Sequence, residues 1–585
     1  MFSRENNIEQ MKYLDDSDFP KMIDLNTGVR IKINDDVLRD VEMVECFSDS
    51  RSVTDEMIDF TVFNETKGYL REILSHPIRD KLTLNKRQRY LQKMMHHDEV
   101  NSELQIIKGN LSSIKWLLTT KDKEMIDVMD TVYLQWWVIR AANVFPCAIT
   151  SKNTYSIILS PTIGIISPVM YIILPYLVVK YKYKIDIPFK LYLKTLYLAT
   201  SSSIHGAKDG SFLHAISCLS FASTIFFYFH GMIQSLEHAK QTYSICHLIC
   251  GHVKSILYIY KRYHALMNTS FLEINPFYEF GDRVFLKCID EDFSLNCMDN
   301  RMVFTNFGKL LKLYRDLNSE QNKYELRKMM NHLFILDALC SIKTCIISND
   351  LTKCSYDFHS RDPYIVFDDS RHIGLSSHSI GNNVSRRKRR NTILTGPNAS
   401  GKSTFIKGVL INIILSQTIS HNATTRSIIT PFDFIGSQIN IPDCKGKESL
   451  FEAEMYRCKR NFDYMKRNKE HKCILFMDEI FNSTNFVEGV SGAYSILAHM
   501  SSLKNCIVFV TTHYPLLTKL NEDYNYHLQK FDCQKIDGKI TYDYKLRDGV
   551  CDKYVALDIL EENGYDYSII NFANQIKKDL ISKIS

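Results

Sequence analysis

The chain has 585 residues, several times the roughly 150 of one domain, so it should fold as two to four units with at least one large core. Hydrophobic residues make up 45% and charged residues 24%, which excludes a disordered, collagen-like or wholly membrane-embedded chain. The formal net charge is only +6, so any contact with nucleic acid must come from a local basic patch.

Sixteen cysteines are scattered without a C-x-x-C pair, and the N-terminus lacks the apolar stretch of a signal peptide. We therefore expect reduced thiols in an intracellular protein, with its nuclear, cytoplasmic or membrane-associated location left open. Cys246, His247, Cys250 and His252 could in principle ligate zinc. Their spacing matches no standard site, however, and Cys and His are also ordinary helix-face residues.

The first half of the chain has mainly helical periodicity. Apolar residues between Glu56 and Val100 predict a helical hairpin with its turn at Pro77, and the pattern continues from Ile106 to Ala142. Two apolar runs then follow, Thr154–Val179 and Gly210–Leu236, and neither contains Asp, Glu, Lys or Arg.

Each of these runs exceeds the roughly 20 apolar residues that span a bilayer, so two membrane helices are one interpretation. A buried or an interfacial helical hairpin is the other. The loop between the runs holds Lys180, Lys182, Lys184, Lys190, Lys194 and Lys208 against two aspartates. The positive-inside rule would place that loop in the cytosol and both long flanking segments on the far side.

Helical patterning returns at 256–349, where residues 323–346 predict one long amphipathic helix. From Tyr364 onward, short β-branched runs alternate with helical segments, which indicates an α/β domain with a mostly parallel sheet. The basic run at 386–390 favours a solvated turn over a DNA-binding patch.

A strand, a glycine loop and a helix are predicted around residues 391–415. The loop satisfies G-x-x-x-x-G-K-[ST] with Gly396, Gly401, Lys402 and Ser403. Such a loop closes backbone N–H groups around phosphate, while the lysine reaches the β and γ phosphates and the serine ligates Mg²⁺. If the lysine-rich loop faced the cytosol, this glycine loop would lie on the other side of the membrane, away from cytosolic ATP. The prediction of two membrane helices and the prediction of an ATP site therefore conflict.

Two further buried strands end in polar residues. The first ends in Asp478 and Glu479, and the second delivers His513 to the same edge of a parallel sheet. We expect Asp478 to hold the Mg²⁺ shell and Glu479 to orient and deprotonate the attacking water. His513 could donate a hydrogen bond to the γ-phosphate, although a surface turn is an alternative for it.

These motifs, in this order, resemble the MutS family of ATPases. The loop at 396–404 is similar to the family's G-P-N-x-x-G-K-S-T, residues 476–480 to its M-D-E-I strand end, and 511–514 to its T-H-Y switch. Residues 448–455 resemble its S-x-F-x-x-E-M signature, which in relatives reaches across a dimer to the partner's ATP. The expected site comprises, for ATP, Gly396, Pro397, Asn398, Gly401, Lys402, Ser403, Thr404 and Ser449; for Mg²⁺, Ser403 and Asp478; and for hydrolysis, Glu479 and His513.

The resemblance implies an all-α core and lever region followed by an α/β P-loop ATPase domain of the ABC type. Weaker matches lie at Leu70–Leu74 in the core hairpin, at Asp337 in the lever and at Arg371–His372. Residues 482–485 replace the family's glycine-rich loop and lack both glycines, which puts intersubunit signalling in doubt. The expected divisions are a short N-terminal segment 1–55, a helical core or lever 56–150, an apolar hairpin or degenerate clamp 151–240, returning lever helices 241–350 and the ATPase domain 351–585.

The resemblance favours a truncated relative that lacks the N-terminal mismatch-recognition domain, because only residues 1–55 precede the core hairpin. It implies an ATP-dependent DNA-binding protein of mismatch repair or recombination that acts with a second MutS-like subunit, a homodimer being favoured. The alternative is a membrane-associated MutS-like ATPase without mismatch recognition, whereas a protein with a dead site is disfavoured because the catalytic residues are present. The basic residues nearest to a DNA groove are Lys81, Lys86, Arg87, Arg89 and Lys93, which could equally form a solvated helix face.

Overall fold

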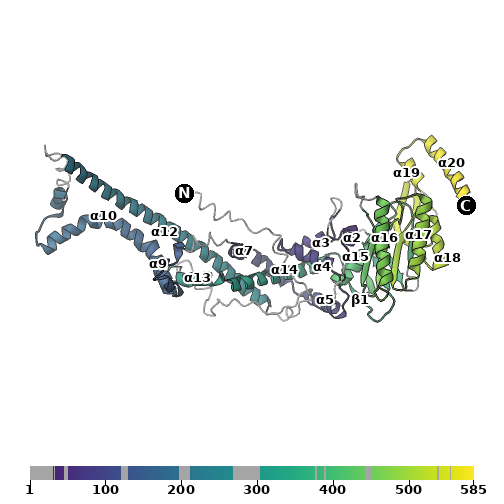
Figure 1. Ribbon diagram of the computed structural model, residues 1–585, viewed down its shortest axis with the longest axis horizontal. Helices are drawn as coiled ribbons and strands as arrows, with labels where there is room; N and C mark the ends of the chain where they lie inside the picture. Colours follow the sequence, from purple (N-terminus) through teal and green to yellow (C-terminus); the bar gives the residue numbers. More distant parts are fainter. Residues whose placement is uncertain are drawn as a thin grey trace. The chain divides into compact units, whose positions relative to one another are not determined.

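The computed structural model combines helices and β-sheets (Figure 1). It describes residues 31–584 except 32, 45, 47–50, 120–129, 197–210, 268–302, 376–378, 388–390, 442–448, 537–538, 552 and 554. These residues form two compact units, each considered separately below. The first contains the described residues between 106 and 265 and between 303 and 330, and the second contains those between 31 and 105, residues 266 and 267, and those from 331 onward.

Helices make up the described chain before residue 350. They are α2 (Asp35–Asp40), α3 (Asp55–Ile58), α4 (Thr66–Ser75), α5 (Lys81–Met94), α6 (Glu99–Lys108), α7 (Leu111–Thr119), η3 (Arg140–Val144), α9 (Pro146–Thr154), η4 (Tyr155–Leu159), α10 (Ser160–Leu177), η5 (Val178–Lys182), α12 (Ser211–Met267), α13 (Val303–Leu317) and α14 (Glu320–Ser348). The predicted hairpin around Pro77 is confirmed by α4 and α5. The predicted helical pattern at 106–142 is interrupted, since Gly109 and Asn110 separate α6 from α7.

Helix α14 was expected to be amphipathic, but its apolar part is buried on nearly all sides. Met329, Leu333, Leu336 and Leu339 are all inaccessible or nearly so, and so is the carboxylate of Asp337. The reason is that α4 and its preceding turn pack against it, with Phe63 in edge contact with Phe334 at 5.4 Å between ring centroids. Among the described residues, α14 is the one single helix that is long and apolar enough to cross a membrane. Of its apolar stretch of 18 residues, 83% is buried. The bent pair Pro146–Ser167 and Ile172–Lys182 passes the same test only if the two are taken together.

The second unit contains two sheets, and the larger has six strands in the order β11-β10-β4-β9-β8-β7. Its strands are β4 (Thr392–Thr395), β7 (Phe434–Gln438), β8 (Cys473–Met477), β9 (Cys506–Thr511), β10 (His527–Ile536) and β11 (Lys539–Asp548). Every pairing is parallel except β10 with β11. This agrees with the mostly parallel sheet that the alternation after Tyr364 predicted.

The smaller sheet was not predicted as a separate layer. Its order is β3-β2-β6-β1-β5, and it mixes parallel and antiparallel pairs. The strands are β1 (Thr352–Tyr356), β2 (Ile365–Ser370), β3 (Asn382–Arg386), β5 (His421–Asn422) and β6 (Arg426–Ile429). It begins before Tyr364, because β1 pairs with strands that follow α15 in the chain.

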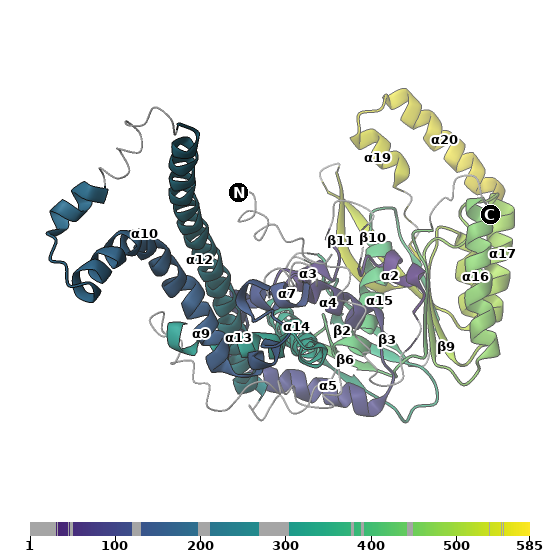
Figure 2. The same cartoon turned by 60° about the vertical axis from the view of Figure 1, so that its left-hand side comes forward.

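Helices cover both faces of the larger sheet. The helices from residue 402 onward are α15 (Lys402–Thr418), α16 (Leu450–Arg467), α17 (Phe486–Ser501), η8 (Pro515–Lys519), α18 (Leu520–Tyr524), α19 (Ala556–Glu562) and α20 (Tyr567–Ile584). Helix α15 contacts both sheets and is buried on almost every side, whereas α16 and α17 lie side by side on the opposite face of the larger sheet (Figures 1 and 2). Strands β8 and β9 are buried along their whole length, so this sheet forms the rigid core of the second unit.

The expectation that the basic run at 386–390 forms a solvated turn is wrong for its first residue. Arg386 is not in a solvated turn: it is the buried last residue of β3, where it donates to Gln529 and lies 5.2 Å from the ring of Phe509. The rest of the basic run is Arg387, over the ring of Tyr364, and residues 388–390, which lie outside the described residues. In the helix that carries the cysteine and histidine cluster, His252 stacks on Trp116. No group of three or more His, Cys, Asp or Glu side chains in the described ranges is arranged to hold a metal ion.

Candidate functional site

The polar residues after three strands meet because those strands are neighbours in the parallel sheet. β9 lies between β4 and β8, with Leu394 opposite Thr511 and Met477 opposite Val510. Parallel strands deliver the loops after their carboxyl ends to one edge of the sheet, which is where α/β folds bind ligands. The loop after β4 and the polar residues after β8 and β9 therefore share one site, as predicted.

The glycine loop runs from Gly396 to Gly401 and opens directly into α15. Gly401 has φ of +97°, a conformation that favours glycine. A Cβ there would also lie 3.1 Å from the ring of Tyr544, so a side chain at this position would be both strained and crowded. The turn leaves the free N–H groups of the first turn of α15 at the mouth of the loop, an arrangement suited to an anion.

Lys402 is the first residue of α15 and is only 5% exposed. Its ammonium group donates to the carbonyl oxygens of Gly396, at 3.0 Å, and Pro397, at 3.1 Å. Burial lowers the pKa of Lys402, and the negative charges of Glu479 and Asp478 oppose that shift. The loop therefore holds a largely desolvated cation beside two carboxylates.

Glu479 follows the end of β8 and has both carboxylate oxygens in hydrogen bonds. Oε1 lies 3.0 Å from His513 Nε2, and Oε2 accepts from the amide of Asn482 at 2.9 Å. The bond from His513 is the main reason that the pKa of Glu479 is lowered, with Lys402 adding to the effect. Glu479 also has φ of +49°, a backbone conformation that costs energy for a residue with a side chain and is common at functional sites.

His513 also lies near Lys402, with its Nε2 3.3 Å from Nζ. One ring nitrogen cannot donate to Glu479 and accept from an ammonium at the same time. The two carbonyl acceptors of Lys402 favour the state in which the protonated Nε2 of His513 donates to Glu479. This orientation keeps the carboxylate ionised and able to accept a further proton.

Thr511, the last residue of β9, links the two carboxylates, a role that the motif at 511–514 did not predict. Its hydroxyl donates to Asp478 and accepts from the backbone N–H of Glu479 at 3.0 Å. The backbone N–H of Asp478 in turn donates to the carbonyl of Gln438, at the end of β7, at 2.9 Å. The carboxylates are thus positioned from both neighbouring strands.

A cavity of about 800 Å³ opens over the glycine loop. Six predicted residues line it, namely Asn398, Gly401, Lys402, Ser403, Thr404 and Glu479. Ser400 also lines it, and its buried hydroxyl has no hydrogen-bond partner among the described residues. A buried hydroxyl without a partner is costly, so this one fits an acceptor placed in the loop, such as a phosphate oxygen.

Several lining residues come from outside the predicted motifs. His372 lies at one wall, where burial and the charge of Lys407 lower its pKa to about 4, so it is neutral at physiological pH. Tyr544, from β11, lies over the loop, and Leu375 and Ile380 supply apolar walls. The Arg371–His372 match pointed to the first of these, but nothing in the sequence pointed to Tyr544.

Of the other predicted residues, Gly396 and Pro397 accept hydrogen bonds from Lys402. Asp478 and His513 are not among the lining residues and are connected to Glu479, Asp478 through Thr511 and His513 directly. Ser449 stands apart: it is exposed and does not contribute to the described lining of its own chain's cavity. It is the N-cap of α16 and forms a capping box with Glu452, which fixes where the helix begins.

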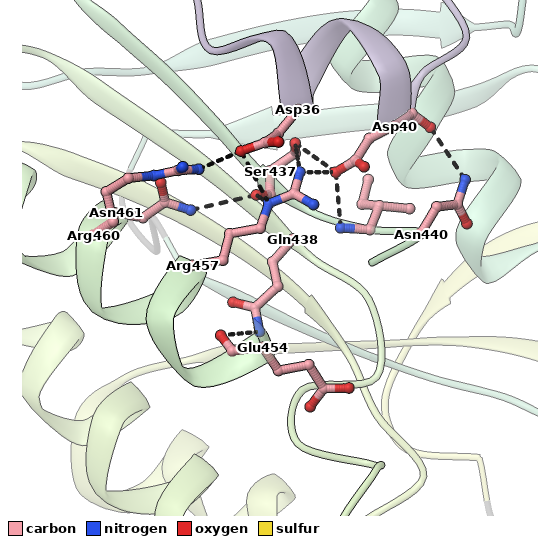
Figure 3. Close-up of polar contacts among 10 residues, drawn as sticks. Asp36, Asp40, Ser437, Gln438, Asn440, Glu454, Arg457, Arg460 and Asn461 are labelled. Atoms are coloured by element: carbon pink, nitrogen blue, oxygen red, sulfur yellow. Dashed lines mark hydrogen bonds and ion pairs between the residues drawn. The ribbon is translucent and has the colours of Figure 1, made fainter. Parts of the chain in front are cut away.

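Helix α16 is held from the N-terminal segment. Asp36 and Asp40, on α2, face Arg460 and Arg457 of α16 (Figure 3). Asp40 also accepts from the hydroxyl of Ser437 at 2.7 Å. These contacts all lie within the second unit and were not predicted.

The proposed DNA-facing set needs one correction. Arg87 is 4% exposed and donates to the carbonyl of Thr418, so it is a structural residue. The remaining four, Lys81, Lys86, Arg89 and Lys93, are exposed along α5.

Residues 392–581 match the family model described as MutS domain V. The DNA mismatch repair protein MSH3 of Candida albicans is 26% identical over 346 residues, which cover 55% of this chain and 30% of that relative. The DNA mismatch repair protein MutS of Finegoldia magna is 29% identical over 286 residues, or 46% of this chain and 32% of the relative. The chain thus spans about a third or less of the length of these relatives. The match falls on the region that contains the glycine loop, both carboxylates and His513, and it identifies this region of the chain as a MutS domain V.

Proposed function

We propose that the chain is an ATPase that hydrolyses ATP to ADP and phosphate and couples this turnover to DNA in mismatch repair or recombination. The observation that carries the proposal is the convergence of Lys402, Glu479 and His513 beside one cavity that also contains the unpartnered hydroxyl of Ser400. This set matches what phosphoryl transfer requires: a phosphate cradle, a cation and an oriented base.

In this proposal the glycine loop and the first turn of α15 bind the phosphates, and the ammonium of Lys402 moves from the loop carbonyls to the β and γ phosphate oxygens. Glu479 accepts a proton from the attacking water, while His513 and Asn482 fix its two oxygens. His513 then donates toward the γ-phosphate as negative charge develops there.

Ser403 and Asp478 are the residues that would hold Mg²⁺. The donor set fits, because both offer oxygen atoms and Asp478 is oriented by Thr511. A bound Mg²⁺ neutralises charge on the phosphate oxygens. Loss of activity with a chelator, and its recovery with added Mg²⁺, would test this assignment.

We further propose that two copies share each site, with Ser449 of one subunit completing the pocket of the other. Its exposure at the start of α16, away from its own cavity, supports this arrangement. Mixing two inactive variants, Lys402→Ala and Ser449→Ala, tests it. In a two-fold dimer, a random mixture should recover about a quarter of the wild-type turnover, because only mixed dimers contain one intact site.

No recovery, with each variant shown to be folded and dimeric, would contradict shared sites. Full activity of Ser449→Ala alone would also remove the dimer proposal, while leaving the ATPase proposal intact. Wild-type protein that neither binds nor hydrolyses ATP would remove both.

The DNA role rests on the names of the relatives and on the exposed basic residues of α5. ATP turnover measured without DNA and with homoduplex, mismatched and branched DNA tests it. Binding should weaken with salt, and Arg89→Glu with Lys93→Glu should reduce the salt dependence if α5 contacts phosphates. The relatives offer no support for the alternative of a membrane-associated ATPase without mismatch recognition. We also propose an intracellular location, consistent with the free cysteines.

A further inference from the structure

A large apolar surface lies on α10 and α12 in the first unit. Exposed side chains on it include Ile163, Ile166 and Val169 on α10 and Phe226, Phe227 and Ile233 on α12, with Phe227 68% exposed. Soluble proteins rarely expose so many large apolar side chains on two successive helices unless a partner or a membrane covers them.

Small residues occupy the contact between the two helices. The hydroxyls of Ser160 and Ser235 are 2.8 Å apart, and a Cβ at Gly164 would lie 3.5 Å from the Cα of Met232. Figure 2 shows α10 and α12 diverging beyond this contact. The larger apolar side chains therefore point outward, which reverses the arrangement of a water-soluble hairpin and is common between helices in lipid.

Lysines follow directly on the apolar surface. Lys180, Lys182, Lys184, Lys190 and Lys194 are accessible to solvent, whereas Asp186 is the single carboxylate between residues 154 and 196. It lies 3.7 Å from Lys180. Apolar side chains bordered by a band of lysines match the two layers of an anionic lipid surface, acyl chains and phosphate headgroups.

The geometry limits how such a surface could meet a bilayer. The segments Pro146–Ser167 and Ile172–Lys182 meet at 60°, so they do not form a straight span. A hairpin that lies along one leaflet, with its apolar side chains among the acyl chains and its lysines at the headgroups, leaves both of its ends on the side from which it bound. This removes the conflict between the lysine-rich loop and a nucleotide site on the far side of a membrane.

We propose that this hairpin surface, defined as the exposed side chains of α10, η5, residues 183–196 and residues 223–236 of α12, binds along one leaflet of a bilayer that contains anionic lipids, with its apolar side chains inserted and its lysines at the headgroups. The proposal does not rest on ATP hydrolysis or DNA binding. Duplex DNA fits the lysines but gains nothing from the apolar side chains. A second copy related by two-fold symmetry fits the apolar side chains but brings like charges together.

Flotation of the full-length protein on a density gradient tests the proposal. The protein is mixed with vesicles of phosphatidylcholine alone or of phosphatidylcholine with phosphatidylglycerol. Wild-type protein should float with the anionic vesicles and remain partly bound in high salt, because insertion of apolar side chains is not screened. Ile163→Glu with Ile166→Glu should reduce the bound fraction at least about tenfold, since charged groups are costly in hydrocarbon.

A matched control places the same charges elsewhere. Leu82→Glu with Ile347→Glu changes two exposed apolar residues of the second unit and should float like wild type. Lys182→Ser with Lys184→Ser and Lys190→Ser should lose the preference for anionic vesicles while keeping some binding. Unchanged thermal unfolding of each variant shows that it is folded.

Two results would overturn the proposal. They are wild-type protein that floats with neither vesicle, and Glu variants that float as well as wild type, whether or not they lose duplex binding or dimerisation. Protein that floats but does not hydrolyse ATP would support this proposal and contradict only the ATPase function.

Discussion

The carboxylate of Asp40 and the guanidinium of Arg457 form an ion pair in which both residues are almost completely buried, at 1% and 7% exposure. The two lie 417 positions apart in the chain. Burial raises the pKa of Asp40, and the charge of Arg457 opposes that shift. Asp40 also accepts from the backbone N–H of Ile439 at 3.0 Å, so one carboxylate connects α2, the end of β7 and α16 (Figure 3).

This connection places Asp40 behind two parts of the candidate site. Arg457 lies two turns after Ser449 on α16. Gln438 lies between Ser437 and Ile439, the two partners of Asp40 at the end of β7, and its carbonyl accepts from the N–H of Asp478. The ion pair between Asp40 and Arg457 therefore fixes the end of β7, which precedes Ser449, and α16, which follows it.

Asp40→Ala should lower the free energy of unfolding by about 3 to 5 kcal/mol, because it leaves a buried guanidinium without its carboxylate. In protein that still folds, kcat should fall more than nucleotide affinity, since the change acts on Ser449 and Asp478 rather than on the glycine loop. Denaturant unfolding and nucleotide titration measure the two effects. Equal losses in kcat and affinity would contradict a positioning role.

Two further variants separate charge burial from a general loss of contacts. Arg460→Ala removes the exposed pair with Asp36 and should cost about 0 to 1 kcal/mol. Asp40→Leu combined with Arg457→Met should be less destabilising than Asp40→Leu alone, because no unpaired charge remains in the core.

The sequence predicted those parts of the site that are local in the chain. The glycine loop, Asp478, Glu479 and His513 each directly follow a buried strand, and parallel pairing brings such strand ends together whatever the rest of the fold does. Thr511 and Asn482 were missed as partners of these carboxylates, because a hydroxyl or amide gains that role only when β9 and the turn after β8 are placed side by side.

Charged residues were the main source of error, and for one physical reason. The basic stretches around Arg87 and Arg386 predict exposed side chains, in a DNA groove or on a solvated helix face for Arg87 and in a solvated turn for Arg386. Each is instead buried against an acceptor from a distant segment, Thr418 and Gln529. Asp40 lies in the N-terminal segment 1–55, for which the sequence predicted no contact. Pairing across hundreds of positions leaves no signal in a single sequence.

Glu479→Gln should reduce the rate of ATP turnover at least about a hundredfold while nucleotide binding is retained. The amide keeps the shape of the carboxylate but cannot accept the proton. Rapid-quench and filter-binding assays measure these two quantities. Asn482→Ala is the matched comparison: it removes one bond to the same carboxylate and should lower kcat by a smaller factor. Unchanged turnover in Glu479→Gln would disprove the assignment of the general base.

The pH dependence of turnover should report the bond between His513 and Glu479. The pKa of Glu479 is lowered mainly by that bond, so its ionised form persists to lower pH in the wild type. In His513→Ala the pKa should rise toward its usual value, and the acid limb of the kcat profile should move to higher pH. His513→Gln retains a donor and should move the limb less. A limb that stays in place in both variants would show that Glu479 does not control it.

Asp337 supplies a test of the fold outside the ATP site. This carboxylate, fully buried in α14, accepts from the backbone N–H groups of Val62 and Phe63, each at 2.9 Å, and from the hydroxyl of Thr66 at 2.6 Å. It thereby satisfies donors at the start of α4. Asp337→Ala should lower the free energy of unfolding by about 2 to 4 kcal/mol, because those donors stay buried without an acceptor.

Asp59→Asn, which weakens only an exposed pair with Arg51, should cost less than about 1 kcal/mol in the same denaturant titration. Equal effects of the two changes would mean that the contact between α14 and the start of α4 does not contribute to stability as the structure indicates.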